Sequence, residues 1–205
     1  DGTFIQDDQE VYYLYALTMD GRTQTGIVAC SDIDDYQNNI IKKHENTRES
    51  KEQDRIRHVD ATDAHTGPIF LVYRQIDSIR QVVETVKKQT PIYSFVADDG
   101  IKHEAWLIDQ KSDLEIIKAG FEQIPATYIA DGHHRCASAV KVGLKRRQDN
   151  PGFTGNEEYN RFLSVLFPDD EMMIMDYNRV VKDLNGMSKE EFMAKLNDLF
   201  EVENK

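Results

Sequence analysis

The densest group of residues able to carry out chemistry is a run of five positions: Asp131, Gly132, His133, His134 and Arg135. An apolar stretch precedes the run, and a segment with helical apolar spacing follows it, which predicts a strand, a bend at the glycine and a helix. The first N–H groups of a helix lack backbone partners and lie at the positive end of its dipole, so they bind anions. Arg135 adds a planar fork for phosphate, and the imidazoles add donors or carry protons. The pattern predicts a phosphate site.

Other interpretations of this run remain open. In the plainest one, Asp131 caps the helix, Gly132 makes the bend, and the basic side chains are merely exposed. Asp131 could also orient a histidine or hold a metal. A zinc site of His133, His134 and Cys136 is less favoured, because adjacent histidines at a helix start diverge. Cys136 could be a nucleophile, since helix N-termini lower thiol pKa values, but we favour a core position for it.

A second polar group begins at His44 and Glu45 and continues with Lys51, Asp54 and Arg55. Phosphoryl transfer needs a carboxylate near the acceptor hydroxyl and usually another for Mg²⁺. Glu45 and Asp54 are candidates for these tasks, and Lys51 and Arg55 could neutralise developing charge. The alternative is a solvated, polar entrance to a helix.

A third polar group contains Asp99, Gly100 and His103. By itself it predicts a hairpin turn, because glycine supplies the positive φ that a tight turn needs. Asp20-Gly21, between two β-rich runs, predicts another hairpin. Further strands are expected at residues 68–73, at 127–130, and as a pair at 162–167 and 172–181.

Helices are predicted at residues 31–41, 48–59, 78–88, 112–123 and 188–200, besides the one after Gly132. The helix at 188–200 begins with Ser188 and has Glu191 three residues later, the spacing of a capping box. The helix at 48–59 shows little apolar periodicity and is typical of a solvated rim. Because strands and helices mix without strict alternation, we predict one α+β domain spanning residues 1–205, with a mixed sheet, hairpins and flanking helices.

Composition limits the class of partner. Lys and Arg total 25 against 37 Asp and Glu, a net charge of −12, which argues against a nucleic-acid backbone as the main partner. Two cysteines form no C-x-x-C pair, no apolar run is long enough for a membrane span, and no signal peptide opens the chain. We expect a cytoplasmic protein with free thiols and no membrane partner. Because residue 1 is Asp, we also expect a piece of a longer protein.

The order of motifs resembles the uncharacterised bacterial and archaeal family called domain of unknown function 1015. The resemblance rests on IIKKHENT at 40–47, the spaced Lys51, Asp54 and Arg55, GPIF at 67–70, DDGIKHEAW at 98–106, YIADGHHR at 128–135 and DYNRVV at 176–181. Members are about twice as long, which implies that this chain is a central fragment. The chain departs from the family at Asp60, which is often basic there, and at Asn178, where a histidine commonly precedes the arginine.

More distantly, the 131–135 turn resembles the phosphate-binding turn of the ParB/sulfiredoxin superfamily, which includes kinases of free serine. This resemblance implies a ParB/sulfiredoxin-like strand-turn-helix that binds ATP or ADP with Mg²⁺, and phosphoryl transfer to a small hydroxylated metabolite. Residues 131–135 would hold the nucleotide phosphates. Glu45 in HENT, with His44 beside it, would act on the acceptor hydroxyl, Lys51 and Arg55 would neutralise charge, and His103 could reach the same pocket. The alternative is a nucleotide-binding regulator or clamp of the ParB-like class without a small-molecule acceptor.

Overall fold

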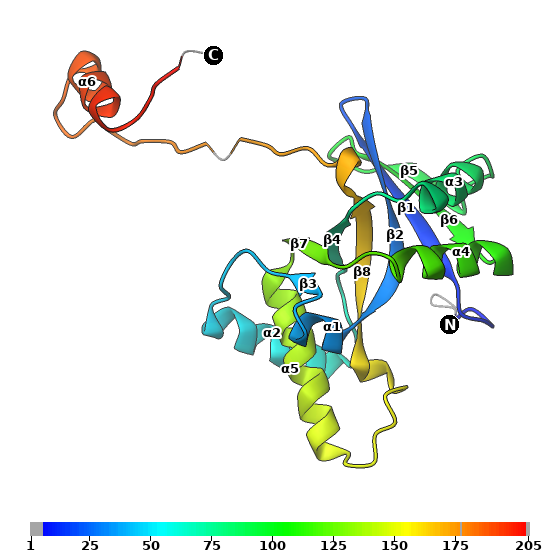
Figure 1. Ribbon diagram of the computed structural model, residues 1–205. Helices are drawn as coiled ribbons and strands as arrows, with labels where there is room; N and C mark the ends of the chain where they lie inside the picture. Colours follow the sequence, from blue (N-terminus) through cyan, green and yellow to red (C-terminus); the bar gives the residue numbers. More distant parts are fainter. Residues whose placement is uncertain (1–5, 177, 204–205) are drawn as a thin grey trace. The chain divides into compact units, whose positions relative to one another are not determined.

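The computed structural model describes residues 6–176 and 178–203, which fall into two compact units, Asp1–Met172 and Met173–Lys205. The first unit is built on a mixed, open sheet of eight strands (Figure 1). The strands are β1 (Tyr12–Met19), β2 (Arg22–Asp32), β3 (Ile41–Lys42), β4 (Ile69–Tyr73), β5 (Tyr93–Val96), β6 (Lys102–Ile108), β7 (Thr127–Asp131) and β8 (Arg161–Pro168). Their order across the sheet is β3-β7-β4-β8-β2-β1-β6-β5.

The pairing of the strands confirms the predicted α+β class and mixed sheet. β3 with β7 and β4 with β8 are parallel, and the other neighbouring pairs are antiparallel. Both hairpins turn where expected: Asp20 and Gly21 have φ values of 50° and 77°, and Gly100 has a φ of 81°. The left-handed backbone at these positions closes the tight turns between β1 and β2 and between β5 and β6.

The helices of the first unit pack beside its sheet in two groups (Figure 1). They are α1 (Ile33–Gln37), α2 (Glu49–Thr62), α3 (Asp77–Val86), α4 (Lys111–Phe121) and α5 (His133–Asp149), with 3₁₀ turns η1 (Glu158–Asn160) and η2 (Asp169–Glu171). A further helix, α6 (Lys189–Leu199), belongs to the second unit. α3 packs on α4, whereas α2 and α1 pack on α5. One apolar cluster joins the sheet to α3, α4 and α5. No helix among the described residues is long and apolar enough to cross a membrane.

A buried carboxylate holds α2 against α5. The Glu52 side chain is 6% exposed and accepts hydrogen bonds from the Lys141 ammonium of α5 and from the Thr47 hydroxyl. The Glu52 backbone carbonyl also accepts a hydrogen bond from the Ser138 hydroxyl at 3.2 Å. Burial alone would raise the pKa of the Glu52 carboxyl, but the hydrogen bonds from Lys141 and Thr47 lower it below its usual value. The helix predicted as a solvated rim is therefore exposed over most of its length, but a buried polar side chain, Glu52, docks it on α5.

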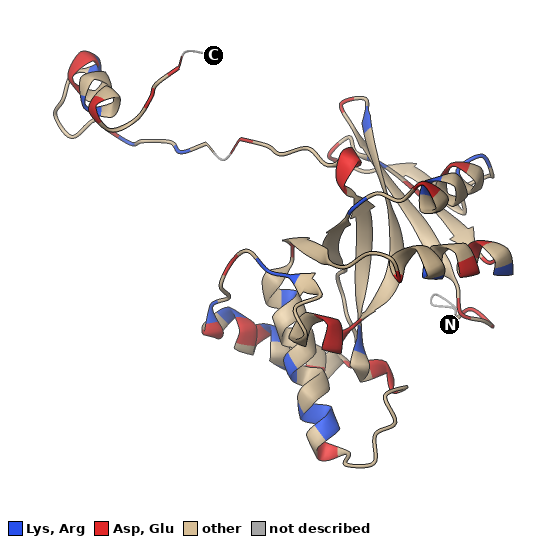
Figure 2. Ribbon diagram, in the orientation of Figure 1, with Lys and Arg blue, Asp and Glu red and all other residues tan. Residues whose placement is uncertain are grey.

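Basic residues gather towards the C-terminal end of α5 (Figure 2), and they pair with acidic residues of neighbouring helices. Lys145 and Arg146 both form ion pairs with Asp60 of α2. Arg147 donates two hydrogen bonds to the Asp34 carboxylate of α1, at 2.6 and 3.0 Å. This contact with Arg147 lowers the pKa of the Asp34 carboxyl. The basic end of α5 therefore serves helix packing, and Asp60 is an acidic partner within that packing.

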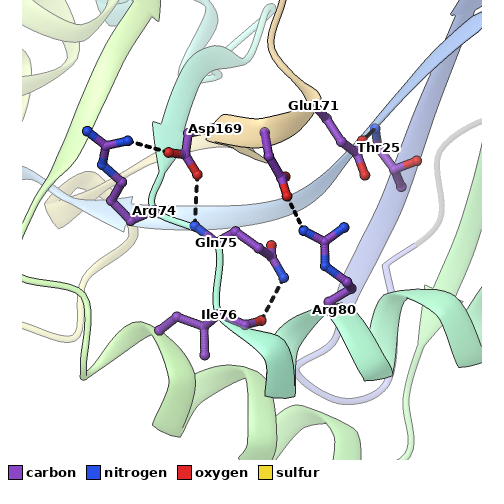
Figure 3. Close-up of polar contacts among 8 residues, drawn as sticks. Thr25, Arg74, Gln75, Ile76, Arg80, Asp169 and Glu171 are labelled. Carbon is purple, nitrogen blue, oxygen red and sulfur yellow. Dashed lines mark hydrogen bonds and ion pairs between the residues drawn. The ribbon is translucent and has the colours of Figure 1, made fainter.

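The acidic turn η2 fastens the end of β8 to two neighbouring segments (Figure 3). Asp169 accepts hydrogen bonds from the Gln75 backbone N–H, at 3.0 Å, and from Arg74, both of which follow β4. The Thr25 backbone N–H of β2 donates to the Glu171 carboxylate. The hydrogen bond from the Gln75 N–H is the main cause that lowers the pKa of the Asp169 carboxyl, and Arg74 adds to it. Burial of the carboxyl acts in the opposite direction but is outweighed. β8 is thus tied at its end to both strands between which it lies.

The second unit contains α6, whose Ser188 and Glu191 form the predicted capping box. The strand predicted at residues 172–181 is wrong, because residues 172–176 and 178–181 form no strand. The physical reason lies in the sheet: β8, its expected partner, already pairs with β2 along one edge and β4 along the other. Tyr177, within the predicted strand and the DYNRVV motif, lies outside the described residues.

The contact of α5 with η1 predicts the effect of adding a methyl group at Gly143. A Cβ there would lie 2.4 Å from the Tyr159 carbonyl oxygen and 2.7 Å from Cδ1 of Ile33. Helix propensity alone would favour alanine by about 1 kcal/mol. We expect Gly143→Ala instead to lower the free energy of unfolding by about 1–3 kcal/mol, measured by urea denaturation, because the site is overpacked. Gly152→Ala, with its nearest contact at 3.8 Å, is the control, and a stabilised Gly143→Ala protein would contradict the packing.

The Glu52 anchor predicts a pH-dependent stability. Glu52→Gln should lower the free energy of unfolding by about 1–2 kcal/mol at pH 7, because the charge-assisted hydrogen bond from Lys141 is lost. Because the folded pKa lies below the unfolded value near 4.5, this contribution is complete above that pH and is lost as the pH falls through the folded pKa. Urea titrations from pH 7 to pH 3 should show that the difference in the free energy of unfolding between wild type and Glu52→Gln decreases as the pH falls. A difference that is constant with pH, or one shared by the exposed Glu115→Gln on α4, would refute the assignment.

Candidate functional site

The turn from β7 to α5 has the form expected of an anion site. β7 ends at Asp131, Gly132 adopts a left-handed conformation with φ 96° and ψ 25°, and α5 begins at His133. The first bond of the helix runs from the Cys136 N–H to the Gly132 carbonyl at 2.9 Å. Gly132 has no side chain with which to cap the helix. The N–H groups of the first turn therefore keep their capacity to bind an anion.

The N-terminus of α2 lies beside this turn. Its N-cap residue, Arg48, makes no side-chain capping hydrogen bond, and the Arg48 backbone N–H donates to Nε2 of His134 at 3.0 Å. His134 is thus occupied in holding the start of α2 to the start of α5. Two helix N-termini, each with the positive end of its dipole, meet at one place.

A surface pocket of about 520 Å³ lies between these two helix starts. It is lined by residues of the 40–47 segment, the first turns of α2, and the end of β7 with the start of α5: Glu45, Ser50, Lys51, Asp54, Arg55, Ala130, Asp131, Gly132, His133, His134 and Arg135. All five residues of the predicted phosphate run contribute to it. The structure therefore brings together two segments that are far apart in the sequence.

Arg135 is held at the pocket wall by Asp131. Its guanidinium donates a hydrogen bond to the Asp131 carboxylate at 2.9 Å, within one turn of chain. The Nε atom of Arg135 is buried and has no hydrogen-bond partner among the described residues. Asp131 therefore orients Arg135, a role different from those considered from the sequence, and Arg135 keeps a free donor.

His133 is the most buried polar side chain of the site, at 5% exposure. Its Nδ1 lies 4.0 Å from Oε1 of Glu45, and its ring makes an edge contact with the His44 ring, with centroids 4.4 Å apart. Burial lowers the pKa of the His133 imidazole, and the neighbouring His44 lowers it further, so the ring is neutral at neutral pH. A second hollow of about 460 Å³ shares Glu45 and His133 with the first and includes His44.

Not every predicted residue lies at this site. His103, on β6, is absent from the lining of both hollows. Its Nδ1 lies 2.6 Å from the Tyr15 hydroxyl, and its ring stacks on Phe95. Cys136 is fully buried in the core, as favoured from the sequence, and burial raises the pKa of its thiol to about 12. With Cys136 in the core and His134 bonded to Arg48, these two and His133 do not form a common metal site.

Two contributors were missed from the sequence. Ser50 lines the pocket because it lies in the first turn of α2, and its signal was the start of that helix. Glu52 does not line the pocket, but its carboxylate accepts hydrogen bonds from Lys141 of α5 and from Thr47, and so holds together the segments that do. No local pattern marks Glu52, because its partner Lys141 lies 89 residues away in the chain.

The chemical capacity of the pocket follows from this lining. Open N–H groups and the cations Lys51, Arg55 and Arg135 suit an anion with several oxygens, such as a polyphosphate. The Glu45 carboxylate is 54% exposed and lines the same pocket, where it can accept a proton or hold a cation. Anion binding and proton transfer are therefore available side by side.

Comparison with known proteins identifies the family of the chain. The family model described as "Protein of unknown function (DUF1015)" matches residues 1–205, which confirms the resemblance drawn from the motifs. No curated protein and no solved structure matches the chain. The matched range includes both segments that form the pocket.

The Asp131–Arg135 pair predicts opposite effects of two substitutions on anion binding. Arg135→Ala should weaken the binding of inorganic pyrophosphate about tenfold or more, because a charge-assisted hydrogen bond is lost. Asp131→Asn should strengthen it, because a carboxylate is removed from the pocket and Arg135 is released. Isothermal titration calorimetry without divalent cations measures both, with the exposed Lys111→Ala of α4 as the control. Equal affinities in all three variants would exclude the pocket as the binding site.

Proposed function

The chain belongs to the DUF1015 family, and we propose that it transfers a phosphoryl group from ATP or ADP to the hydroxyl of a small metabolite such as free serine. The observation that carries the proposal is the meeting of two helix N-termini at a pocket with Lys51, Arg55 and Arg135 in its walls and Glu45 in its lining. Phosphoryl transfer depends mainly on positioning and on neutralising charge, which such a pocket provides.

The first part of the proposal concerns the nucleotide phosphates. The open N–H groups of α5 and the guanidinium of Arg135 would bind phosphate oxygens, and Lys51 and Arg55 from α2 would neutralise the charge that develops in transfer. The partial exposure of the Arg135 side chain, 42%, supports this role, because its guanidinium can reach an anion in the pocket that it lines. The strand-glycine-helix order of β7, Gly132 and α5 supports the more distant resemblance to the ParB/sulfiredoxin phosphate-binding turn.

The second part concerns the acceptor. Glu45 would take the proton of the acceptor hydroxyl, since its carboxylate is exposed to the pocket. His44, which lines the adjoining hollow with Glu45, would help to position the acceptor. His103 has no part in this proposal, because its contacts are with Tyr15 and Phe95.

The third part concerns Mg²⁺, which accompanies a nucleotide. Mg²⁺ takes oxygen ligands and usually binds one or two carboxylates together with substrate phosphates. Asp54 and Asp131 offer carboxylates in the lining, so the residues present fit the ion. When bound, the ion would neutralise charge on the phosphate oxygens.

The proposal predicts the loss of one activity in one variant. Glu45→Ala should lower the kcat for nucleotide-dependent phosphoserine formation about 100-fold or more, because a general base contributes on that scale. Nucleotide binding should be retained, since the phosphate end of the pocket is unchanged. Radiolabelled ATP or ADP with L-serine measures the first, and calorimetry the second. Glu115→Ala, an exposed glutamate on α4, is the matched control.

Full activity of Glu45→Ala would remove this residue from the mechanism. Nucleotide binding and hydrolysis without transfer to any tested hydroxyl acceptor would favour a regulatory clamp instead. If neither ATP, ADP nor CTP binds, and Arg135→Ala behaves like wild type, phosphoryl transfer at this pocket is excluded.

A further inference from the structure

We propose that His44, Glu45 and His133 bind a divalent first-row transition-metal ion such as Zn²⁺ or Mn²⁺. One ligand atom from each of these three residues lies within 4.8 Å of the other two. This site goes beyond the proposed function, in which the only cation is the Mg²⁺ that accompanies a nucleotide. Its three ligands belong to the chain, so it needs no nucleotide.

The spacing of the three side chains suits one ion after a small adjustment. Metal–ligand bonds of about 2.0–2.2 Å place two ligands of a tetrahedral ion about 3.4 Å apart. The His133 Nδ1 to Glu45 Oε1 distance is already 4.0 Å. His44 and Glu45 are exposed and His133 is buried, so the two free side chains can close on the fixed one.

The state of His133 is the second, independent observation. Its side chain is 5% exposed, and its Nε2 is buried without a hydrogen-bond partner among residues 6–176 and 178–203. The distance of 4.0 Å from Nδ1 to Glu45 is too long for a hydrogen bond. A buried imidazole normally has both nitrogens satisfied. Nδ1 is the nitrogen that faces Glu45, so a cation held by the Glu45 carboxylate would bind at Nδ1 and draw Glu45 towards the ring, while Nε2 stays buried.

The ligand types decide which class of cation fits. Two imidazoles and one carboxylate suit Zn²⁺, Mn²⁺ or Fe²⁺, whereas Mg²⁺ and Ca²⁺ prefer sites built from oxygen alone. Three protein ligands leave at least one coordination position open for water or a substrate oxygen. Glu45 and His133 line both hollows, so the ion would lie where the two adjoin. A hydroxyl bound there would lie next to the phosphate pocket.

Neighbouring groups leave these three residues free to act together. His134 is bonded to the Arg48 N–H. Lys43, next to His44 in the chain, has its ammonium 4.0 Å from the centre of the Tyr36 ring. The cations Lys51 and Arg55 belong to the first hollow only. The second hollow thus has one lysine, held on an aromatic ring, against the Glu45 carboxylate.

Titration with Co²⁺, followed by its visible absorption, and with Zn²⁺, followed by competition with a chromophoric chelator, tests the site in the chain without nucleotide. We expect one equivalent to bind, and millimolar Mg²⁺ not to displace it. His44→Ala and Glu45→Gln should each weaken binding about tenfold or more, since even outer-shell changes cost that much in metal sites. Both residues are exposed, so both variants should fold, and circular dichroism checks this. His58→Ala, an exposed histidine in α2, is the control.

The site is refuted if wild type binds neither ion at micromolar concentration, if Mg²⁺ displaces Co²⁺, or if His58→Ala loses as much affinity as His44→Ala. Phosphoserine formation, measured separately, distinguishes this inference from the proposed function. Metal binding without nucleotide turnover would leave the site in place and exclude the kinase. Phosphoserine formation by the wild type, together with an unchanged metal affinity of His44→Ala, would support the kinase and refute the metal site.

Discussion

The site depends on the hydrogen-bonded ion pair between the buried carboxylate of Glu52 and Lys141. Glu52 comes from a helix that is otherwise largely exposed. Its carboxylate accepts hydrogen bonds from Lys141 of α5 and from Thr47, which precedes α2, and the Ser138 hydroxyl of α5 donates to the Glu52 backbone carbonyl. A buried charge is costly unless it is paired and hydrogen-bonded, so the two helices are held in one arrangement rather than free to slide. Because Thr47 belongs to the segment that carries His44 and Glu45, the same carboxylate fixes the place of both pocket walls.

The docking of α2 on α5 also sets the charges around the pocket. The chain carries a net charge of −12, yet the candidate phosphate pocket lies at the positive ends of two helices, with Lys51, Arg55 and Arg135 in its lining. Three carboxylates in the same lining, Glu45, Asp54 and Asp131, balance those three cations. The basic end of α5 is neutralised by Asp60 and Asp34, so it adds little to the field at a distance. An acidic exterior with such a local pocket suits a small anion over a long polyanion, because a nucleic-acid backbone needs a basic face along its length.

Much of the fold could be predicted from local patterns. Asp20-Gly21 and Asp99-Gly100 located two hairpins because a positive φ is a local requirement, and Ser188 with Glu191 located the start of α6 because a capping box spans only one turn. The failures concern distant partners. Residues 172–181 have the apolar character of a strand, but β8 had no edge left to pair with them. His103 carries a catalytic type of side chain, yet the register of β6 between β1 and β5 places it beside Tyr15 and Phe95.

The sequence by itself determined the local half of the site: a strand, a glycine bend and a helix start at 131–135, since these depend on neighbouring residues. It also predicted the polar character of the 40–55 region. Only the tertiary structure decided that these segments face each other, that His134 bonds to Arg48, and that His44 and Glu45 lie against His133. The reason is that β3 pairs with β7 at one edge of the sheet, while Glu52 holds α2 to α5. Both contacts join residues far apart in the chain, and no local pattern records them.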